Sequence, residues 1–185
     1  MNERRILYFE KAGSQNTQET LKRAKERALE LRIKTIVVAS TTGETGLKAL
    51  EEFKNTDMRI IVVGHAGGAE YTEEAKRKIG EKGGTLLFAP HTLSWGVGDA
   101  LRGKYQGFDV NRAVAEAFRR FCEGMKVCIE IAMMVTDAGL VKPGEEIVSI
   151  AGTGRGADTA IVLKTAYTRK FLDLKVREII VMPRE

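Results

Sequence analysis

Residues 35–45 are Thr35-Ile36-Val37-Val38-Ala39-Ser40-Thr41-Thr42-Gly43-Glu44-Thr45. The first five residues of this segment form a β-branched apolar run, which is typical of a buried strand. A loop of hydroxyl residues and glycine follows, and the pattern over 45–53 predicts a helix. A buried strand that leads through a short loop into a helix is half of a strand–helix–strand unit. The segment therefore predicts an α/β fold with a largely parallel sheet.

The same alternation extends on both sides of this segment. Further strands are predicted at residues 6–10, 59–63, 85–89, 146–151, 159–165 and 176–182, the last of them as an edge strand. Further helices are predicted from residue 16 or 17 onward, near 72–80, and over 111–138 with an interruption near Gly124. Because residues 127–135 are strongly apolar, that stretch is expected at the centre of the molecule, packed on the sheet or in a subunit interface. We expect one domain over residues 1–185, with a homo-oligomer left open.

The composition favours an intracellular globular chain. Hydrophobic residues make up 43% of it, and Cys122 and Cys128 have neither metal-ligand nor redox spacing, so both are expected to be packing residues. No apolar stretch approaches the roughly 18 residues of a membrane helix and no secretion signal is recognisable, so we expect a cytoplasmic protein with no membrane partner. The net charge of +5 is spread over helices that carry both signs, which argues against nucleic acid as a partner. High Lys, Glu and Arg content also suggests a thermophile.

The loops that follow the predicted strands hold the candidate binding residues. In open α/β sheets, ligands bind beyond the carboxyl ends of the strands, near the point where the strand order reverses. Glycines, hydroxyl residues and histidines dominate these loops. The candidate binding residues are Ser40, Thr41, Thr42, Gly43, Thr45, His65, His91, Thr92, Gly152, Thr153, Gly154, Arg155 and Gly156.

The loop at residues 40–45 is expected to bind an anion. It leads into the N-terminus of a helix, where backbone N–H groups and the helix dipole favour negative charge. Ser40, Thr42 and Thr45 would add hydroxyl donors, and Gly43 would allow either a close backbone approach to a phosphate oxygen or a positive φ. A helix cap without a ligand is the alternative interpretation.

The loop at residues 152–157 matches the dinucleotide-binding pattern G-x-G-x-x-A by its letters. That pattern has to open a helix, whereas the residues that follow here, 159–163, predict a strand. A dinucleotide-binding loop is therefore rejected. A glycine-rich turn between two strands remains, and Arg155 gives it one cation suited to phosphate or carboxylate.

Other polar and aromatic residues could complete a site. His65 and His91 both follow predicted strands and could face one cleft, but without a nearby carboxylate cluster they do not predict a metal site. Trp95 and Tyr105 could stack on a ring or pack at the rim of the core. Glu130 and Asp137, in or at the end of an apolar helix, are expected to make structural hydrogen bonds, with a functional role left open.

Four segments carry a resemblance to a known family. They are residues 37–43, 126–131, 137–140 and 151–160, which include Val-Val-Ala-Ser-Thr-Thr-Gly and Ala-Gly-Thr-Gly-Arg-Gly-Ala-Asp-Thr-Ala. They resemble a largely archaeal family of stand-alone proteins built on the C-terminal α/β domain of pyruvate kinases. The resemblance implies a three-layer α/β/α fold, with a mostly parallel sheet and an antiparallel strand near the C-terminus.

The resemblance also implies a phosphate ligand. In pyruvate kinases the matching loops hold the phosphates of an allosteric sugar bisphosphate, while catalysis takes place in a separate barrel domain that this sequence lacks. Glu44 departs from the pattern, because an acidic residue suits a phosphate poorly, and the second loop is shorter. One phosphate loop, one Arg, and His65, His91 and Trp95 for a planar group favour a mononucleotide-sized ligand such as flavin mononucleotide (FMN). A phosphosugar-binding regulatory module without catalysis is the alternative.

Overall fold

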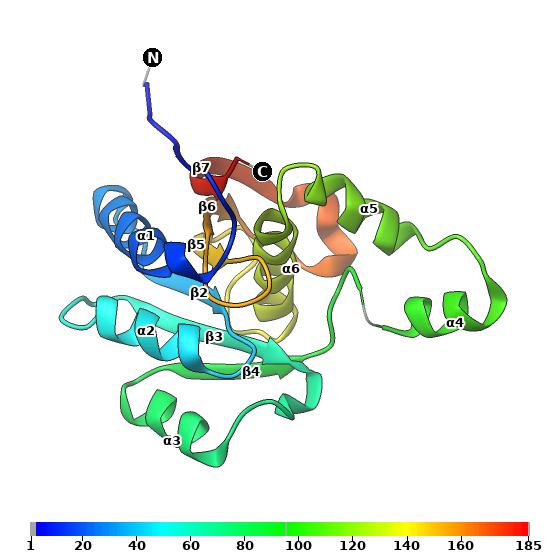
Figure 1. Cartoon of the computed structure of the whole chain (residues 1–185), viewed down its shortest axis with the longest axis horizontal. Coiled ribbons are helices and arrows are strands. Elements are labelled where there is room, and N and C mark those ends of the chain that lie inside the picture. The colour runs from blue at the N-terminus through cyan, green and yellow to red at the C-terminus, as the bar shows by residue number, and fades with distance from the viewer. Residues whose placement is uncertain (1–2, 95, 185) are drawn as a thin grey trace.

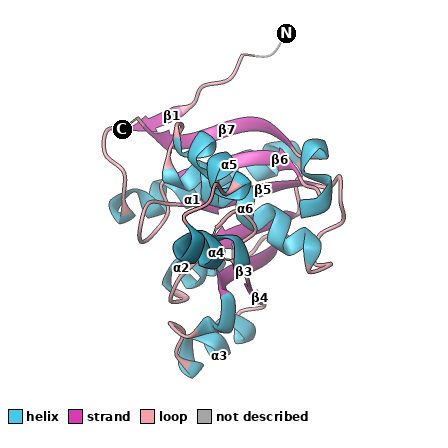
Figure 2. Cartoon of the chain, turned by 90° about the vertical axis from the view of Figure 1, so that its right-hand side faces the viewer, coloured by secondary structure: helices cyan, strands magenta, loops and turns pink. Residues whose placement is uncertain are grey.

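The structure is a computed structural model, and it describes residues 3–94 and 96–184. The described residues form one seven-stranded sheet in the order β1-β7-β6-β5-β2-β3-β4 (Figures 1 and 2). The strands are β1 (Leu7–Phe9), β2 (Thr35–Ala39), β3 (Arg59–His65), β4 (Thr85–Ala89), β5 (Glu146–Ala151), β6 (Thr159–Lys164) and β7 (Lys175–Pro183). Of these strands β6 alone runs antiparallel to its neighbours, β5 and β7. The mostly parallel sheet with one antiparallel strand near the C-terminus is therefore confirmed.

Helices cover both faces of the sheet, which gives the predicted three layers (Figure 1). The helices are α1 (Thr17–Leu31), α2 (Glu44–Glu52), α3 (Glu73–Glu81), α4 (Val97–Tyr105), α5 (Val110–Arg119) and α6 (Glu123–Asp137), with short 3-10 helices at Ser14–Asn16, Ala66–Gly68 and Thr168–Asp173. The first three α-helices pack on one face, where Leu21, Leu50 and Ile79 are buried. Helices α5 and α6 cover the other face.

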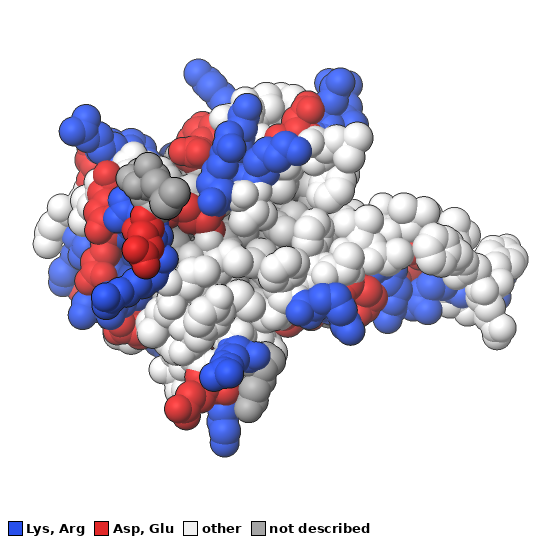
Figure 3. Space-filling model, turned by 90° about the horizontal axis from the view of Figure 1, so that it is seen from above, with Lys and Arg blue, Asp and Glu red and all other residues white. Residues whose placement is uncertain are grey.

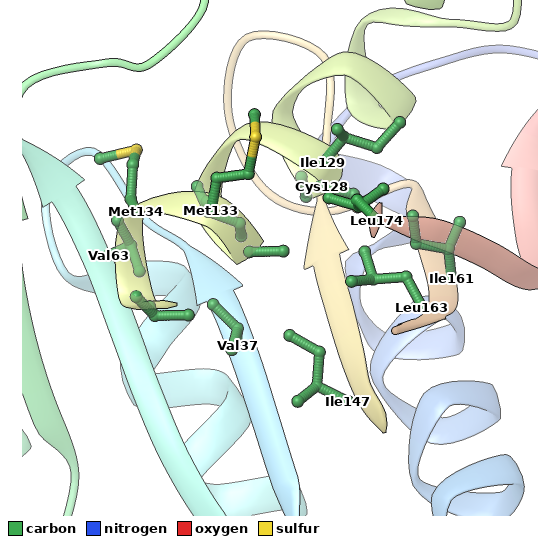
Figure 4. Close-up of a cluster of buried hydrophobic side chains, with 14 of the residues drawn as sticks. Val37, Val63, Cys128, Ile129, Met133, Met134, Ile147, Ile161, Leu163 and Leu174 are labelled. Carbon is green, nitrogen blue, oxygen red and sulfur yellow. The ribbon is translucent and has the colours of Figure 1, made fainter. Parts of the chain in front are cut away.

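Helix α6 forms the centre of the second layer, as its apolar sequence predicts. Ile129 and Met133 are almost fully buried, and they pack with Val37, Ile147 and Ile161 of the sheet (Figure 4). Burial of this many apolar side chains removes them from water and is the main stabilising term of the layer. Val127, at the start of the predicted buried stretch, is only half-buried because it borders a cavity.

One expectation about the fold is wrong, and one helix was not predicted. Strand β7 is not an edge strand, since it pairs with β6 on one side and with β1 on the other. The N-terminal strand occupies the edge instead, and at three residues it is too short to reveal a pairing preference by pattern. Helix α4 was not expected at all, and it projects from the body of the molecule together with the start of α5 (Figure 1).

The projecting helix α4 has no buried residues along its described length, which explains why its pattern was weak. Val97, Leu101 and Tyr105 recur every fourth residue and are all more than half exposed. Elsewhere the surface carries charges of both signs, which are interspersed on the face shown in Figure 3. Within the described residues, no helix combines the length and apolar character needed to cross a membrane.

Candidate functional site

A cavity of about 430 Å³ opens at the carboxyl ends of the parallel strands. It lies where the strand order reverses, because the chain moves outward from β2 to β3 and β4 and then returns to place β5 on the other side of β2. Both predicted loops reach this cavity. The candidate residues that line it are Ser40, Thr41, Thr42, Thr45, His65, His91, Gly152, Gly154, Arg155 and Gly156.

The first loop, residues 40–45, is held by its own hydrogen bonds. The Oγ atom of Ser40 accepts from the N–H groups of Gly43, at 3.1 Å, and Gly46, at 3.3 Å. The hydroxyl of Tyr71 donates to the carbonyl oxygen of Ser40 at 2.7 Å. The buried Ser40 side chain therefore shapes the loop and caps the N–H of Gly46 in the first turn of α2, while its expected role as a hydroxyl donor to a ligand stays a prediction.

Gly43 serves the conformation of this loop. Its φ is +95°, which favours glycine, and an added Cβ would lie 3.0 Å from the Tyr71 ring. Gly43 is not among the described residues that line the cavity. Of the two expected roles, close approach to a phosphate or a positive φ, the structure therefore supports the positive φ. The N–H groups of Glu44 and Thr45, in the first turn of α2, have no carbonyl one turn earlier in the helix to accept them.

The second loop, the turn at residues 152–156, is fixed at its ends. The buried carboxylate of Asp158 accepts from the N–H groups of Gly13, at 2.9 Å, and Thr153, at 3.1 Å. The hydroxyl of Thr17 accepts from the N–H of Ala157 at 3.0 Å. Between these anchors Arg155 is exposed at the cavity mouth. The strand β6 that follows confirms that this turn does not open a helix.

The two histidines form a chain of contacts with a buried carboxylate. Nδ1 of His65 lies 2.7 Å from Nε2 of His91, and the two rings are inclined by 23° with centroids 4.9 Å apart, so they meet edge to edge. Nδ1 of His91 lies 2.8 Å from Oε2 of Glu130. At the other end of the chain, Nε2 of His65 lies 3.5 Å from the hydroxyl of Thr41. The expected common cleft for the histidines is present, and Glu130 is a carboxylate partner that the sequence did not reveal.

Glu130 is fully buried and has several donors. Its Oε1 atom accepts from the N–H of Leu93 at 2.8 Å and from Ser94 at 3.3 Å, and its Oε2 atom lies 2.5 Å from Nζ of Lys126. Burial raises the pKa of the Glu130 carboxyl, but the hydrogen bond from His91 and the charge of Lys126 outweigh burial and leave the pKa below its usual value. Lys126 and Glu130 are one turn apart, so this ion pair was visible in the sequence as an i,i+4 pair inside an apolar helix.

The rest of the cavity wall is mostly apolar or held in ion pairs, and Glu70 adds an exposed acidic side chain. Val63, Val127, Ile131 and Met134 form its apolar part. Arg119, which also lines it, is paired with Glu123 at 2.5 Å and with Glu116 at 2.8 Å. Lys126 is paired with Glu130. Among the described residues that line the cavity, Arg155 is thus the Lys or Arg side chain that forms no close ion pair.

Several candidates lie outside the cavity. Thr92 and Thr153 are not among its described lining residues, and the buried Oγ1 atom of Thr92 has no hydrogen-bond partner within the described part of the chain. Tyr105 is 67% exposed on α4, so ring stacking in the cleft was a wrong expectation for it. Trp95 lies outside the described residues. Asp137 accepts from the N–H of Thr168 at 3.0 Å, which confirms a structural hydrogen bond.

Comparison with known proteins identifies the family. The model of the pyruvate kinase alpha/beta domain matches residues 18–163. Among solved structures, a pyruvate kinase from Cryptosporidium parvum is similar at 13% identity and a TM-score of 0.41, over 80% of this chain and 23% of that one. A pyruvate kinase of the same organism in complex with ADP is similar at 12% identity and a TM-score of 0.39, over 79% and 22%. The chain thus spans about a quarter of those enzymes. Since the family model matches most of the sequence, the chain belongs to the family of the pyruvate kinase alpha/beta domain.

Proposed function

We propose that the cleft binds a small molecule that carries one phosphate group, with FMN as the leading candidate. The observation that supports this most is that loop 40–45 and turn 152–156, far apart in sequence, line one cavity of about 430 Å³. That volume is within the range of roughly 300–1,000 Å³ found for small-molecule pockets.

Loop 40–45 is the better place for the phosphate. The N–H groups at the start of α2 and the hydroxyls of Thr41, Thr42 and Thr45 offer donors, and the helix dipole favours an anion. Arg155 can approach from the opposite turn and form a charge-assisted hydrogen bond. Glu44 does not oppose this arrangement strongly, because Lys48 pairs with it at 2.7 Å.

The charges of the cavity favour one phosphate over two. Arg119 and Lys126 are each neutralised by a glutamate, so a second phosphate would lack a cation of its own. The apolar wall of Val63, Val127, Ile131 and Met134 suits a planar ring better than a second anion. This balance supports a mononucleotide-type ligand over the alternative, a sugar bisphosphate bound by a regulatory module.

Thermal unfolding with four ligands tests the proposal. FMN, riboflavin, fructose bisphosphate and inorganic phosphate are each added in excess, and a ligand that binds only the folded state raises Tm. We expect FMN to stabilise and riboflavin, which lacks the phosphate, to have much less effect. The purified protein should also bind FMN with a visible change in the flavin spectrum. Stabilisation by fructose bisphosphate alone would favour the regulatory module, and no response to any phosphate compound would refute a phosphate site.

Other expectations from the sequence stay predictions. They are a stand-alone protein of archaeal and thermophilic origin, a cytoplasmic location and a homo-oligomer. Light scattering at several concentrations would determine the number of subunits.

A further inference from the structure

The hydrogen bonds around Glu130 determine where the protons of the histidine pair lie. Lys126 and the N–H of Leu93 can only donate to Glu130, so this carboxylate acts as the acceptor. Nδ1 of His91 must then carry the proton that it shares with Glu130. In a neutral His91 this leaves Nε2 as an acceptor, which receives the Nδ1 proton of His65. The remaining ring nitrogen, Nε2 of His65, then carries no proton and acts as an acceptor through its lone pair, 3.5 Å from the hydroxyl of Thr41.

That lone pair lies where the proposed phosphate would bind. His65 and Thr41 both line the cavity, and Thr41 belongs to loop 40–45. A neutral Nε2 without a proton would repel a phosphate oxygen, since both atoms offer only lone pairs. A protonated Nε2 would instead donate a charge-assisted hydrogen bond to it.

We propose that the cleft takes up one proton when it binds a phosphate dianion, with the proton entering at Nε2 of His65 and the charge shared through His91 with Glu130. The inference rests on the proposed function. One N–H bond forms at Nε2 and one O–H bond breaks in the proton donor, which is solvent water or a buffer acid. The Nδ1 proton of His65 can then move along its 2.7 Å contact to His91, which places the cation beside the Glu130 carboxylate. In this second step the N–H bond at Nδ1 of His65 breaks and an N–H bond forms at Nε2 of His91.

The charges around His65 agree with a proton that arrives with the ligand. Burial first, and then the neighbouring His91, lower the pKa of His65, with Lys126 acting in the same direction. Glu70 and Glu130 act in the opposite direction without outweighing them. The lowered pKa favours the neutral form of His65 in the free site, and a bound dianion within about 4 Å would raise the pKa of His65. Arg119, Glu44 and Glu123, which also line the cavity, are held in ion pairs of their own.

Histidine NMR tests the inference directly, because the chain contains only two histidines. Protein labelled with ¹⁵N in histidine is titrated with inorganic phosphate at about pH 8, where phosphate is mainly dianionic. Sodium chloride of matched ionic strength is the control, and amide shifts of loop 40–45 report binding separately. We expect both rings to begin neutral and one ring nitrogen to move to the imidazolium position as phosphate saturates the site.

The outcomes separate this inference from the proposed function. Amide shifts in loop 40–45 with both rings still neutral would overturn proton uptake and leave phosphate binding intact. An absence of shifts in both the loop and the rings would overturn both. If the inference is correct, the affinity for phosphate dianion falls about tenfold per pH unit above the pKa of His65 in the complex, because one proton is bound with the ligand.

Two variants test whether the Glu130 carboxylate balances the charge of the imidazolium. Glu130→Gln should remove the imidazolium signal and lower phosphate affinity at pH 8 by at least about tenfold, since a neutral amide cannot balance the cation. Glu146→Gln is the matched control, because Glu146 is exposed at the opposite end of β5. If Glu130→Gln fails to fold because Lys126 loses its partner, the paired change Lys126→Met with Glu130→Gln removes both buried charges. Either variant that keeps full proton uptake would overturn the role of Glu130.

Discussion

Loop 40–45 and turn 152–156 line the same cavity, yet their backbones are held in different ways. The first is fixed from within, because the Ser40 side chain binds two N–H groups of its own segment and Tyr71 covers it. The second is fixed only at its ends, by Asp158 and Thr17, and its middle residues are exposed. A site that joins a preformed loop to an adaptable one can hold a phosphate rigidly on one side while it admits ligands of different shape on the other.

The largest effect should come from filling space at the anchored end of turn 152–156. In Gly156→Ala the new Cβ would lie 2.4 Å from Oγ1 of Thr17 at a φ of +76°. Backbone strain and overpacking together predict a loss of about 3 kcal/mol in the free energy of unfolding, measured by urea denaturation. The matched control is Gly154→Ala, which has a similar φ of +73° but open space around its Cβ. It should lose only the strain, about 1 kcal/mol, and equal losses would show that the close contacts with Thr17 and Ser14 add no cost.

A smaller effect is expected in the preformed loop. Gly43→Ala places a Cβ 3.0 Å from the Tyr71 ring at a φ of +95°. Since the ring can shift by a few tenths of an ångström, most of the cost is backbone strain, about 2 kcal/mol in the free energy of unfolding. Calorimetry on the folded variant should also show weaker FMN binding, because the N–H groups of the loop would be displaced. Unchanged binding would place the phosphate elsewhere.

The exposed middle of turn 152–156 should affect binding without affecting stability. Arg155→Ala is expected to weaken FMN binding by about 1.5–3 kcal/mol, the range for a hydrogen bond to a charged group. The loss should shrink as salt rises, because part of it is screened electrostatics. Calorimetry at two ionic strengths measures both quantities, and urea denaturation should give the parent value. A loss that is independent of salt would contradict a role for the charge.

The smallest expected effect is on the pH dependence of the free energy of unfolding. It concerns loop 40–45, because His65 contacts Thr41 of that loop. The pKa of His65 is lowered by burial in the folded protein, so the unfolded chain binds this proton more readily. Stability should therefore fall as the pH drops below about 6.5, the ordinary value for histidine, and become level below the folded pKa. His65→Gln should flatten that part of a stability profile measured by urea denaturation, whereas Arg155→Ala should keep it. An unchanged slope in His65→Gln would show that another group titrates.

The sequence predicted β2, β5 and the two loops that follow them because these strands are rich in β-branched residues and lead directly into hydroxyl or glycine residues. It could not place β7 between β1 and β6, because strand order depends on pairings between residues far apart in the chain. The interpretation of Gly43 was left open for the same reason, since Tyr71 and Ser40 reach it only in the folded protein. Glu130 was expected to make structural hydrogen bonds, but its contacts with Lys126 and His91 were missed, because a charged residue inside an apolar helix gives no sign of the histidine that it contacts.

The pairing of β1 with β7 has a consequence for the order of folding. These strands come from opposite ends of the fold, and Leu7 pairs with Val181. During synthesis the first strand must wait until nearly all the other residues have left the ribosome, whereas β2, β3 and β4 can pair with near neighbours in the chain. β1 can therefore pair in the sheet only after β7 is available. Until then β1 is an unpaired edge of the nascent chain, and at three residues it offers little backbone to a wrong partner.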